Sequence, residues 1–376
     1  MMSGLPTRMK SYSDYAGVSI PLCGDFEQAG TSKSTAPWSK SSQISPTTLS
    51  LEIKHFLEYM TPSDREIAIR QDVISRFTTL IESINDTVTT YVDVKSLYPK
   101  ILRSGFASRV ETVFLASIPV IKVTDKLTGI EIDLSDGGSR GINATNAVLK
   151  WMKKDEEIVK MLFFVVKTFL MVRRCGSTYT GGINSYVLVW MIVAWVNLEW
   201  PKIKGKQTPH KADDEDHLSS IMSSFGNLSI YANTYPTDRT SISPSYTGHS
   251  LQSYYGEALK GFLSFYGHHF DYHSCAIIIE PKPFYTTKTS VYSKYNTQRY
   301  LLCIVDPADA SVDMGSKAYG INHVKASFQD AYSVISKSGH SNGSLTVMLG
   351  GEFTTFVKKR QEIAKCADRL AVLDPS

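Results

Sequence analysis

The stretch IPVIKVTDKLTGIEIDLS, residues 118–135, predicts two short apolar strands joined by a turn at Lys126–Gly129. Apolar and acidic side chains alternate over residues 130–134, so Glu131 and Asp133 share one face of the second strand. A carboxylate on the open face of a strand can hold a divalent metal, because hard cations prefer oxygen ligands. The alternative interpretation is a solvated edge strand whose acidic side chains simply face water.

The composition bounds the class of protein. The chain has 376 residues, 42% of them hydrophobic, which is enough for a full core and for two domains. Its formal net charge of +4 permits a polyanionic partner without requiring one. The five cysteines include no CxxC pair, which argues against a zinc site and a disulfide framework and suits a reducing compartment.

Two apolar runs, Met161–Val172 and Tyr186–Val196, are too short to span a membrane, and Lys167 interrupts the first. We expect both to be core helices of a soluble protein with no membrane partner. Predicted strands gather in the middle of the chain and predicted helices at both ends, which is typical of an α+β fold.

Helical periodicity predicts the first two helices beyond a Ser-, Thr-, Gly- and Pro-rich leader. We expect Pro46 to open the first helix, and Ser63 and Glu66 to form a capping box at the start of the second. The lone Trp38 of the leader is expected to dock on the folded body. Further along, residues 137–141 are expected to form a loop and residues 300–305 a strand.

Two further features of the sequence could bind an anionic ligand. Lys167 lies inside an apolar run, where a charge is costly unless it is paired or reaches water. The residue either extends to the surface or points into a cleft, where it would attract a triphosphate. Thr180, Gly181 and Gly182 precede a predicted helix, an arrangement that favours a bound anion, although a plain capping turn explains it equally.

Three blocks of sequence together resemble the noncanonical poly(A) RNA polymerases, the TRAMP-type branch of the DNA polymerase beta-like nucleotidyltransferases. The blocks are Pro37-Trp38 with LEIKHFLEYMTP at residues 51–62, KTFL at 167–170 with YTGGINSY at 179–186, and Asp306-Pro307, Asp313-Met314-Gly315, Tyr319 and VKASFQDAY at 324–332. The order and spacing of the blocks make the resemblance specific.

The resemblance implies a nucleotidyltransferase palm, with a mixed and truncated sheet, and a helical central domain associated with poly(A) polymerases. The domain boundaries that we expect are a disordered leader at 1–45, an N-terminal helix at 46–62, the incomplete palm at 63–139, the central domain at 140–345 with a flexible insertion at 202–252, and a C-terminal helix and tail at 346–376. The reaction implied is addition of AMP from ATP to an RNA 3′ end.

The resemblance also implies roles for individual residues. Asp133 would be the catalytic and metal-binding carboxylate that activates the attacking 3′-hydroxyl, and Lys167 would contact the triphosphate. Ser185 would bind phosphate through its hydroxyl and Tyr186 would stack on the base. Thr180, Gly181 and Gly182 would belong to the same nucleotide-binding site. Asp313 would accept a hydrogen bond from the exocyclic amine of adenine, whereas on its own it is equally a loop aspartate that forms an Asx turn.

Two of the three carboxylates that the family uses are not found. They form an Asp-x-Asp pair after a Gly-Ser turn, and no such pair precedes residue 118. Asp93 is the nearest acid, but it lacks both its partner and the glycine turn. The alternative function is therefore a catalytically inactive pseudo-polymerase that binds nucleotide or RNA, or acts as a scaffold.

The resemblance implies Mg²⁺ or Mn²⁺ as cofactor and ATP and an RNA 3′ end as partners. Family members of this type work with a zinc-knuckle RNA-binding protein and an RNA helicase, so the same partnership is expected here. The location expected is intracellular, in the nucleus rather than the cytoplasm.

Overall fold

The computed structural model describes residues 36–39, 48–84, 94–114, 119–135, 138–153, 155–204, 254–291, 299–337, 343–350, 353, 357–358 and 360–366. Most of the predicted leader, the predicted insertion beyond Lys204, the C-terminal tail and Asp93 lie outside these residues.

A three-stranded sheet with the order β1-β2-β3 confirms the predicted hairpin. The strands are β1 (Ala107–Val113), β2 (Val120–Asp125) and β3 (Glu131–Ser135). Both strand pairs are antiparallel, so this part of the chain holds an antiparallel sheet where a mixed one was expected. The turn between β2 and β3 closes with a hydrogen bond from Gly129 N to Asp125 O, and Gly129 has φ +73°, a conformation that favours glycine.

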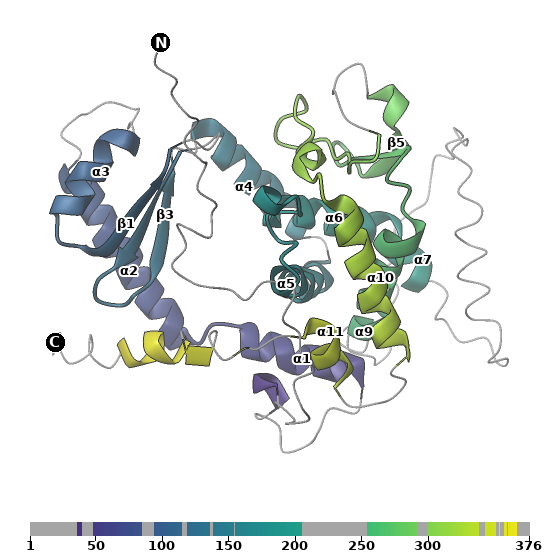
Figure 1. Ribbon diagram of the computed structural model, residues 1–376, viewed down its shortest axis with the longest axis horizontal. Helices are drawn as coiled ribbons and strands as arrows, with labels where there is room; N and C mark the ends of the chain where they lie inside the picture. The colour runs from purple at the N-terminus through teal and green to yellow at the C-terminus, as the bar shows by residue number, and fades with distance from the viewer. Residues whose placement is uncertain are drawn as a thin grey trace, which may run out of the picture. The chain divides into compact units, whose positions relative to one another are not determined.

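Two helices cover one face of this sheet, α2 (Asp64–Ile84) and α3 (Val94–Arg103) (Figure 1). Burial of the apolar side chains of β2 against these helices forms a small core made of Phe77, Leu97, Ile101, Ile121 and Val123. The opposite face keeps the polar side chains, as the alternation predicts, and Glu131 and Asp133 are both exposed there.

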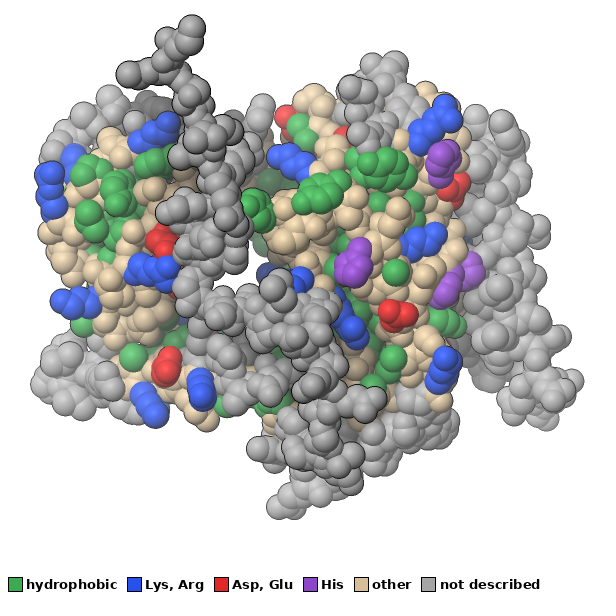
Figure 2. Space-filling model, viewed as in Figure 1, with side chains coloured by type: hydrophobic (Ala, Val, Ile, Leu, Met, Phe, Trp, Pro, Cys, Tyr) green, Lys and Arg blue, Asp and Glu red, His purple; other side chains and the backbone are tan. Residues whose placement is uncertain are grey.

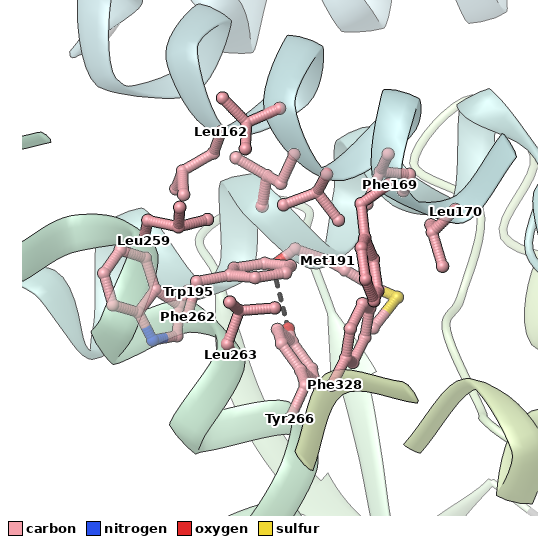
Figure 3. Close-up of a cluster of buried hydrophobic side chains, with 14 of the residues drawn as sticks. Leu162, Phe169, Leu170, Met191, Trp195, Leu259, Phe262, Leu263, Tyr266 and Phe328 are labelled. Atoms are coloured by element: carbon pink, nitrogen blue, oxygen red, sulfur yellow. Dashed lines mark hydrogen bonds between the residues drawn. The ribbon is translucent and has the colours of Figure 1, made fainter. Parts of the chain in front are cut away.

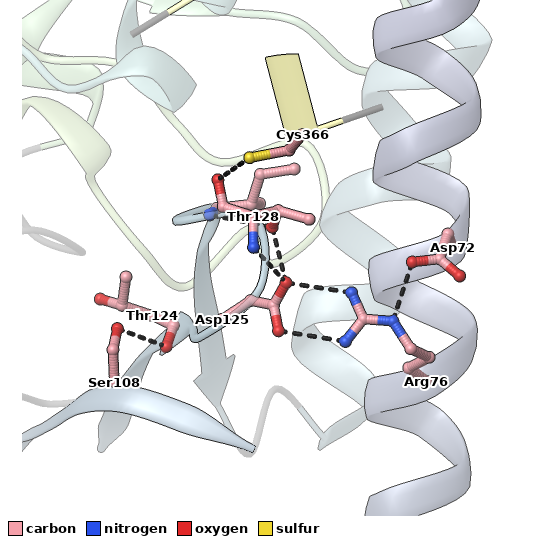
Figure 4. A network of polar contacts seen from close by, with 8 residues as sticks. Asp72, Arg76, Ser108, Thr124, Asp125, Thr128 and Cys366 are labelled. Carbon is pink, nitrogen blue, oxygen red and sulfur yellow. Dashed lines mark hydrogen bonds and ion pairs between the residues drawn. The ribbon is translucent and has the colours of Figure 1, made fainter. Parts of the chain in front are cut away.

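A buried ion pair fixes the hairpin to α2. Asp125, fully buried, accepts hydrogen bonds from Arg76 Nη1 at 3.1 Å and Nη2 at 3.0 Å, and from Thr128 Oγ1 at 2.6 Å (Figure 4). Arg76 also donates to Asp72 from Nε. Burial acts to raise the pKa of Asp125, but the hydrogen bonds from Arg76 and Thr128 outweigh it and hold the pKa below the usual aspartate value.

The helical part contains α1 (Leu49–Met60), α4 (Gly138–Met152), α5 (Glu156–Val172), α6 (Ser185–Leu198), α7 (Trp200–Lys204), α9 (Tyr255–Ser264), α10 (Ile321–Lys337) and α11 (Ser344–Leu349). Shorter turns are η2 (Pro37–Ser39), η3 (Thr178–Thr180), the π-helical turn η6 (Phe265–His269), η7 (Lys288–Ser290) and η8 (Met314–Lys317). A two-stranded antiparallel hairpin pairs β4 (Cys275–Ile278) with β5 (Phe284–Thr287).

The two apolar runs become α5 and α6, which pack in one core with α9 and α10 (Figure 3). Every residue of α6 from Val187 to Val196 is buried. Within this core Phe262, Tyr266 and Phe328 pack together, and Tyr266 Oη donates to the carbonyl of Met191 at 2.8 Å. None of the helices in the described residues has the length and apolar character needed to cross a membrane.

The N-terminal helix packs on the same core. Trp38 is fully buried with ring contacts to Phe56 and Phe353, so the predicted docking of this tryptophan is confirmed. Glu52, 2% exposed, caps the N-terminus of α11 by accepting hydrogen bonds from the backbone N–H groups of Leu345 and Thr346 at 2.8 and 3.0 Å. This cap joins residues that are nearly 300 positions apart in the chain.

The junction of α1 and α2 contains the predicted capping box. Ser63 N donates to Glu66 Oε2 at 2.8 Å, and Glu66 N donates to Ser63 Oγ at 3.2 Å. The C-terminal segment reaches the same junction, where Arg360 donates to Glu66 and to the carbonyl oxygens of Tyr59 and Thr61. The guanidinium therefore bonds to both sides of the junction.

Three local predictions are wrong. The first helix begins at Leu49 with Thr48 as its N-cap rather than at Pro46, because the Thr48 hydroxyl accepts from Leu51 N. The expected loop at 137–141 is mostly the first turn of α4, which begins at Gly138. Residues 300–305 form only isolated bridges, and the ladder there belongs to the β4–β5 hairpin instead.

Because Asp125 is buried and paired, Asp125→Asn should lower the free energy of unfolding by about 3 kcal/mol near neutral pH. The difference in free energy of unfolding between wild type and variant should shrink as the pH falls through the lowered pKa of Asp125. At low pH the wild-type carboxyl is protonated, so the wild type also loses the charged form that Arg76 stabilises. Urea denaturation at a series of pH values measures both effects.

The matched control is Asp72→Asn, which removes the other carboxylate bonded to Arg76. Its side chain is 43% exposed, so its loss should cost less than about 1 kcal/mol. The role assigned to the buried pair would be contradicted if both variants lost the same free energy of unfolding. It would also be contradicted if the loss in Asp125→Asn did not change with pH.

Candidate functional site

Asp133 lies on the open face of β3, the edge strand of the described sheet. Directly across from it on β2 is Lys122, and Glu111 lies across from Lys122 on β1. Charged side chains of opposite sign thus alternate across this face, at the close spacing of neighbouring strands. The carboxylate is accessible, as a catalytic acid must be, and its nearest cross-strand neighbour is a cation.

The resemblance implies three carboxylates for a two-metal site, and Asp133 is the one residue predicted for that role that lies among the described residues. In them no group of three or more His, Cys, Asp or Glu side chains is close enough together to hold a metal ion. Asp93, the other acid considered from the sequence, lies outside these residues. The donor set in the described residues therefore does not fit two metal ions on its own.

The N-terminus of α6 is built as the sequence predicts. Asn184 is the N-cap, and its side-chain oxygen accepts from Val187 N at 2.9 Å. Ser185 and Tyr186 follow as the first two helical residues, both half-buried. The positive end of the helix dipole therefore lies at Ser185, where it favours an anionic ligand such as phosphate.

Tyr186 is tied to a distant loop. Its hydroxyl donates to Asp306 Oδ1 at 2.8 Å, and its ring packs edge-on against Trp190 with centroids 5.7 Å apart. Burial and the neighbouring Asp306 carboxylate raise the pKa of Tyr186 far above its usual value. The hydroxyl therefore stays protonated, and the ring is held in one orientation by contacts at both ends.

The glycine turn before α6 is shaped by close contacts between backbones. Gly181 has φ +81°, and a Cβ atom there would lie 2.5 Å from the Tyr319 ring. A Cβ atom on Gly182 would lie 2.0 Å from the carbonyl oxygen of Cys175. The Thr180 hydroxyl donates within the same turn, to the carbonyl oxygens of Arg174 and Ser177. Both glycines are thus required by the fold, whether or not a ligand binds.

Asp313 lies in the loop that Asp306 begins. Its Oδ1 accepts from Gly315 N at 2.9 Å and from Ile304 N at 3.0 Å, and the residue is 8% exposed. The bond to Gly315 is the Asx turn considered as the alternative from the sequence. Contact with an adenine amine stays a prediction for this residue.

Lys167 is half-buried on α5, with Nζ 5.3 Å from the centroid of the Phe163 ring. A cation over an aromatic face is stabilised without a carboxylate partner. This contact explains how the charge is tolerated inside an apolar helix. Contact with a triphosphate stays a prediction.

Hydrogen bonds join most of the predicted nucleotide-binding residues into one region. Gly320 N donates to Gly181 O at 2.8 Å, Tyr186 bonds to Asp306, and Val305 pairs with Asp313. The glycine turn, the start of α6 and the segment 306–320 are therefore neighbours. No described bond connects Lys167 or Asp133 to this region.

Two residues that shape this region cannot be recognised from the sequence. Asp306 belongs to the third block of the resemblance, but nothing in the sequence marks it as the partner of Tyr186. Lys288 is 1% exposed and donates to the carbonyl oxygens of Tyr272, Arg299 and Leu301, and its burial lowers its pKa. This lysine fixes residues 299–301, which lead into the bridges that hold Asp313.

Comparisons with known proteins agree with the fold. Residues 254–312 match the family model described as Cid1 family poly A polymerase. The polymerase core of TRAMP, an RNA surveillance complex, superimposes with a TM-score of 0.61 at 21% identity, covering 89% of this chain and 99% of that one. The predicted α+β fold is confirmed, and it is the fold of that polymerase core.

Two named relatives align over most of the chain. Poly(A) RNA polymerase cid14 of Schizosaccharomyces pombe is 24% identical over 315 residues, which are 76% of this chain and 40% of that protein. Poly(A) RNA polymerase protein 2 of Saccharomyces cerevisiae is 24% identical over 335 residues, which are 80% of this chain and 50% of that protein. The chain thus spans half or less of the length of these relatives.

The close contact at the glycine turn generates a prediction. Gly182→Ala should lower the free energy of unfolding by about 1–3 kcal/mol, because a Cβ atom would clash with the Cys175 backbone. Gly141→Ala is the matched control, since a Cβ atom there meets nothing within 4 Å and alanine favours the α4 helix. Thermal and urea denaturation should show a loss only for the first variant, and equal stability of both would contradict the assigned contact.

Proposed function

We propose that this chain, which belongs to the noncanonical poly(A) RNA polymerase family, is a nucleotidyltransferase that adds AMP from ATP to the 3′ end of RNA. The relatives named above span at least twice the aligned length, so the activity of the whole protein is part of this proposal.

The observation that carries the proposal is the hydrogen bond between Tyr186 Oη and Asp306 Oδ1, 2.8 Å long. It holds an aromatic ring in a fixed orientation beside a helix N-terminus, so one place offers a stacking surface for a base and a positive dipole for a phosphate. A nucleoside triphosphate carries both groups. Preorganised contacts of this kind favour binding, because the protein loses little conformational freedom when the ligand arrives.

Each nucleotide contact has a role under this proposal. Tyr186 stacks on the adenine ring, Ser185 donates its hydroxyl to a phosphate oxygen, and Lys167 supplies a point charge for the triphosphate. Asp313 accepts from the exocyclic amine of adenine. Asp313 Oδ1 already accepts hydrogen bonds from two backbone N–H groups of its loop. The same carboxylate would therefore have to accept from the loop and from the adenine amine at once.

A divalent metal is the normal cofactor of nucleotidyltransferases in this family, and we propose Mg²⁺ or Mn²⁺ here. Asp133 would be one of its ligands. One carboxylate binds magnesium weakly without substrate phosphates. We propose that Asp133 accepts the proton of the RNA 3′-hydroxyl as that oxygen attacks the α-phosphorus of ATP, and that pyrophosphate leaves.

The proposed partners are ATP and an RNA 3′ end, with a zinc-knuckle RNA-binding protein and an RNA helicase as protein partners. The name of the TRAMP structure, an RNA surveillance complex, supports a role for this chain in RNA processing or surveillance. Intracellular location, in the nucleus rather than the cytoplasm, belongs to the same proposal.

Primer extension tests the activity. Purified chain with oligo(A) RNA, ATP and Mg²⁺ should lengthen the primer, and Asp133→Asn should slow extension by about 100-fold or more because the general base is lost. Glu131→Gln is the matched control, since Glu131 lies on the same face of the same strand, two residues away, and should leave the rate nearly unchanged.

Two other outcomes would overturn this proposal. If no extension occurs but ATP binds and Tyr186→Ala weakens that binding, the chain is a pseudo-polymerase that keeps a nucleotide site. If Glu131→Gln and Asp133→Asn reduce extension equally, Asp133 is not the catalytic acid.

A further inference from the structure

Two large aromatic side chains are exposed beside the glycine turn. Tyr179 is 62% exposed and Tyr319 is 60% exposed. They come from segments 140 residues apart in the chain, η3 and the residues after η8, and neither ring has a part in the function proposed above. Exposed aromatic rings at neighbouring positions offer flat faces on which planar groups such as bases can stack.

The two tyrosines are held rigidly. Tyr319 Oη donates to the backbone carbonyl of Tyr179 at 2.8 Å, and Gly320 N donates to Gly181 O at 2.8 Å. The Tyr319 ring lies against Gly181, so close that only glycine fits there. A ring that is fixed before its ligand arrives loses little entropy on binding, which strengthens stacking.

The chain around these rings is basic. Residues 173–186 and 315–325, the two segments that hold these tyrosines, contain Arg173, Arg174, Lys317 and Lys325 and no Asp or Glu. Arg173 lies over the Phe169 ring and Lys325 over the Tyr272 ring, at 5.4 and 5.7 Å from the centroids. Figure 2 shows one face of the molecule, on which hydrophobic side chains lie near Lys and Arg side chains and a smaller number of Asp and Glu side chains.

Exposed aromatic rings carried by two basic segments match one class of ligand well. Single-stranded RNA presents planar bases to stack and phosphates to neutralise, whereas a protein partner would need a large apolar surface. We propose that Tyr179 and Tyr319 form a stacking platform for bases of the RNA strand. This inference rests on the proposed function, because it assigns a second contact to the same RNA substrate.

Binding of fluorescein-labelled oligo(A), measured by fluorescence anisotropy, tests the platform. Tyr179→Ala and Tyr319→Ala should each weaken binding by about 5- to 100-fold, as expected for the loss of one stacked base. Tyr319→Phe keeps the ring and should stay within about threefold of wild type. Tyr300→Ala removes a tyrosine that is 47% exposed but belongs to neither basic segment, and it should have no effect.

A second probe separates stacking from charge attraction. An abasic strand of the same length keeps the phosphates and lacks the bases, so the two alanine variants should bind it as wild type does. Lys317→Ala, in contrast, should weaken binding to both strands and lower the salt dependence. Melting curves establish that each variant is folded.

The outcomes are distinct from those of the primer-extension test. Weakened oligo(A) binding by the alanine variants supports the platform even where the chain extends no primer. Wild-type affinity in Tyr179→Ala and Tyr319→Ala, or an equal loss with Tyr319→Phe and Tyr319→Ala, would overturn it. A loss of affinity for the abasic strand as large as for oligo(A) would also overturn it, because stacking would then not explain the effect.

Discussion

The helical part depends on the complete burial of α6. A helix that is apolar on every side is stable only when other elements surround it, and α5 and α9 are among those that do so here. Because the interior is closely packed, α6 cannot rotate or slide without opening cavities. Its first turn is therefore fixed in position, and with it Ser185 and Tyr186. The first turn of α6, which carries two of the proposed nucleotide contacts, is rigid for the same reason that the core is stable.

The predictions that succeeded rest on local patterns. Alternation over residues 130–134 placed Asp133 on the open face, and the turn at Lys126–Gly129 followed from its glycine. The spacing of Ser63 and Glu66 was enough to predict a capping box, since both hydrogen bonds lie within one helical turn. Such features depend on residues three or four positions apart, which a single sequence displays directly.

The features that escaped prediction depend on distant residues. Arg76 and Asp125 are 49 positions apart, and Tyr186 and Asp306 are 120 apart. The role of Lys288 is not visible in the sequence, because only the folded chain brings the carbonyl oxygens of Tyr272, Arg299 and Leu301 around its ammonium group. The residue types within the candidate site were therefore predictable, but the contacts that orient them were not.

The cap that Glu52 places on α11 has a consequence for synthesis of the protein. Glu52 is made early, whereas its partners Leu345 and Thr346 follow almost 300 residues later. Until they leave the ribosome, the carboxylate must stay in water, because burying it without donors would be costly. α1 therefore cannot complete its packing before residues 345 and 346 have been made, almost 300 positions after it.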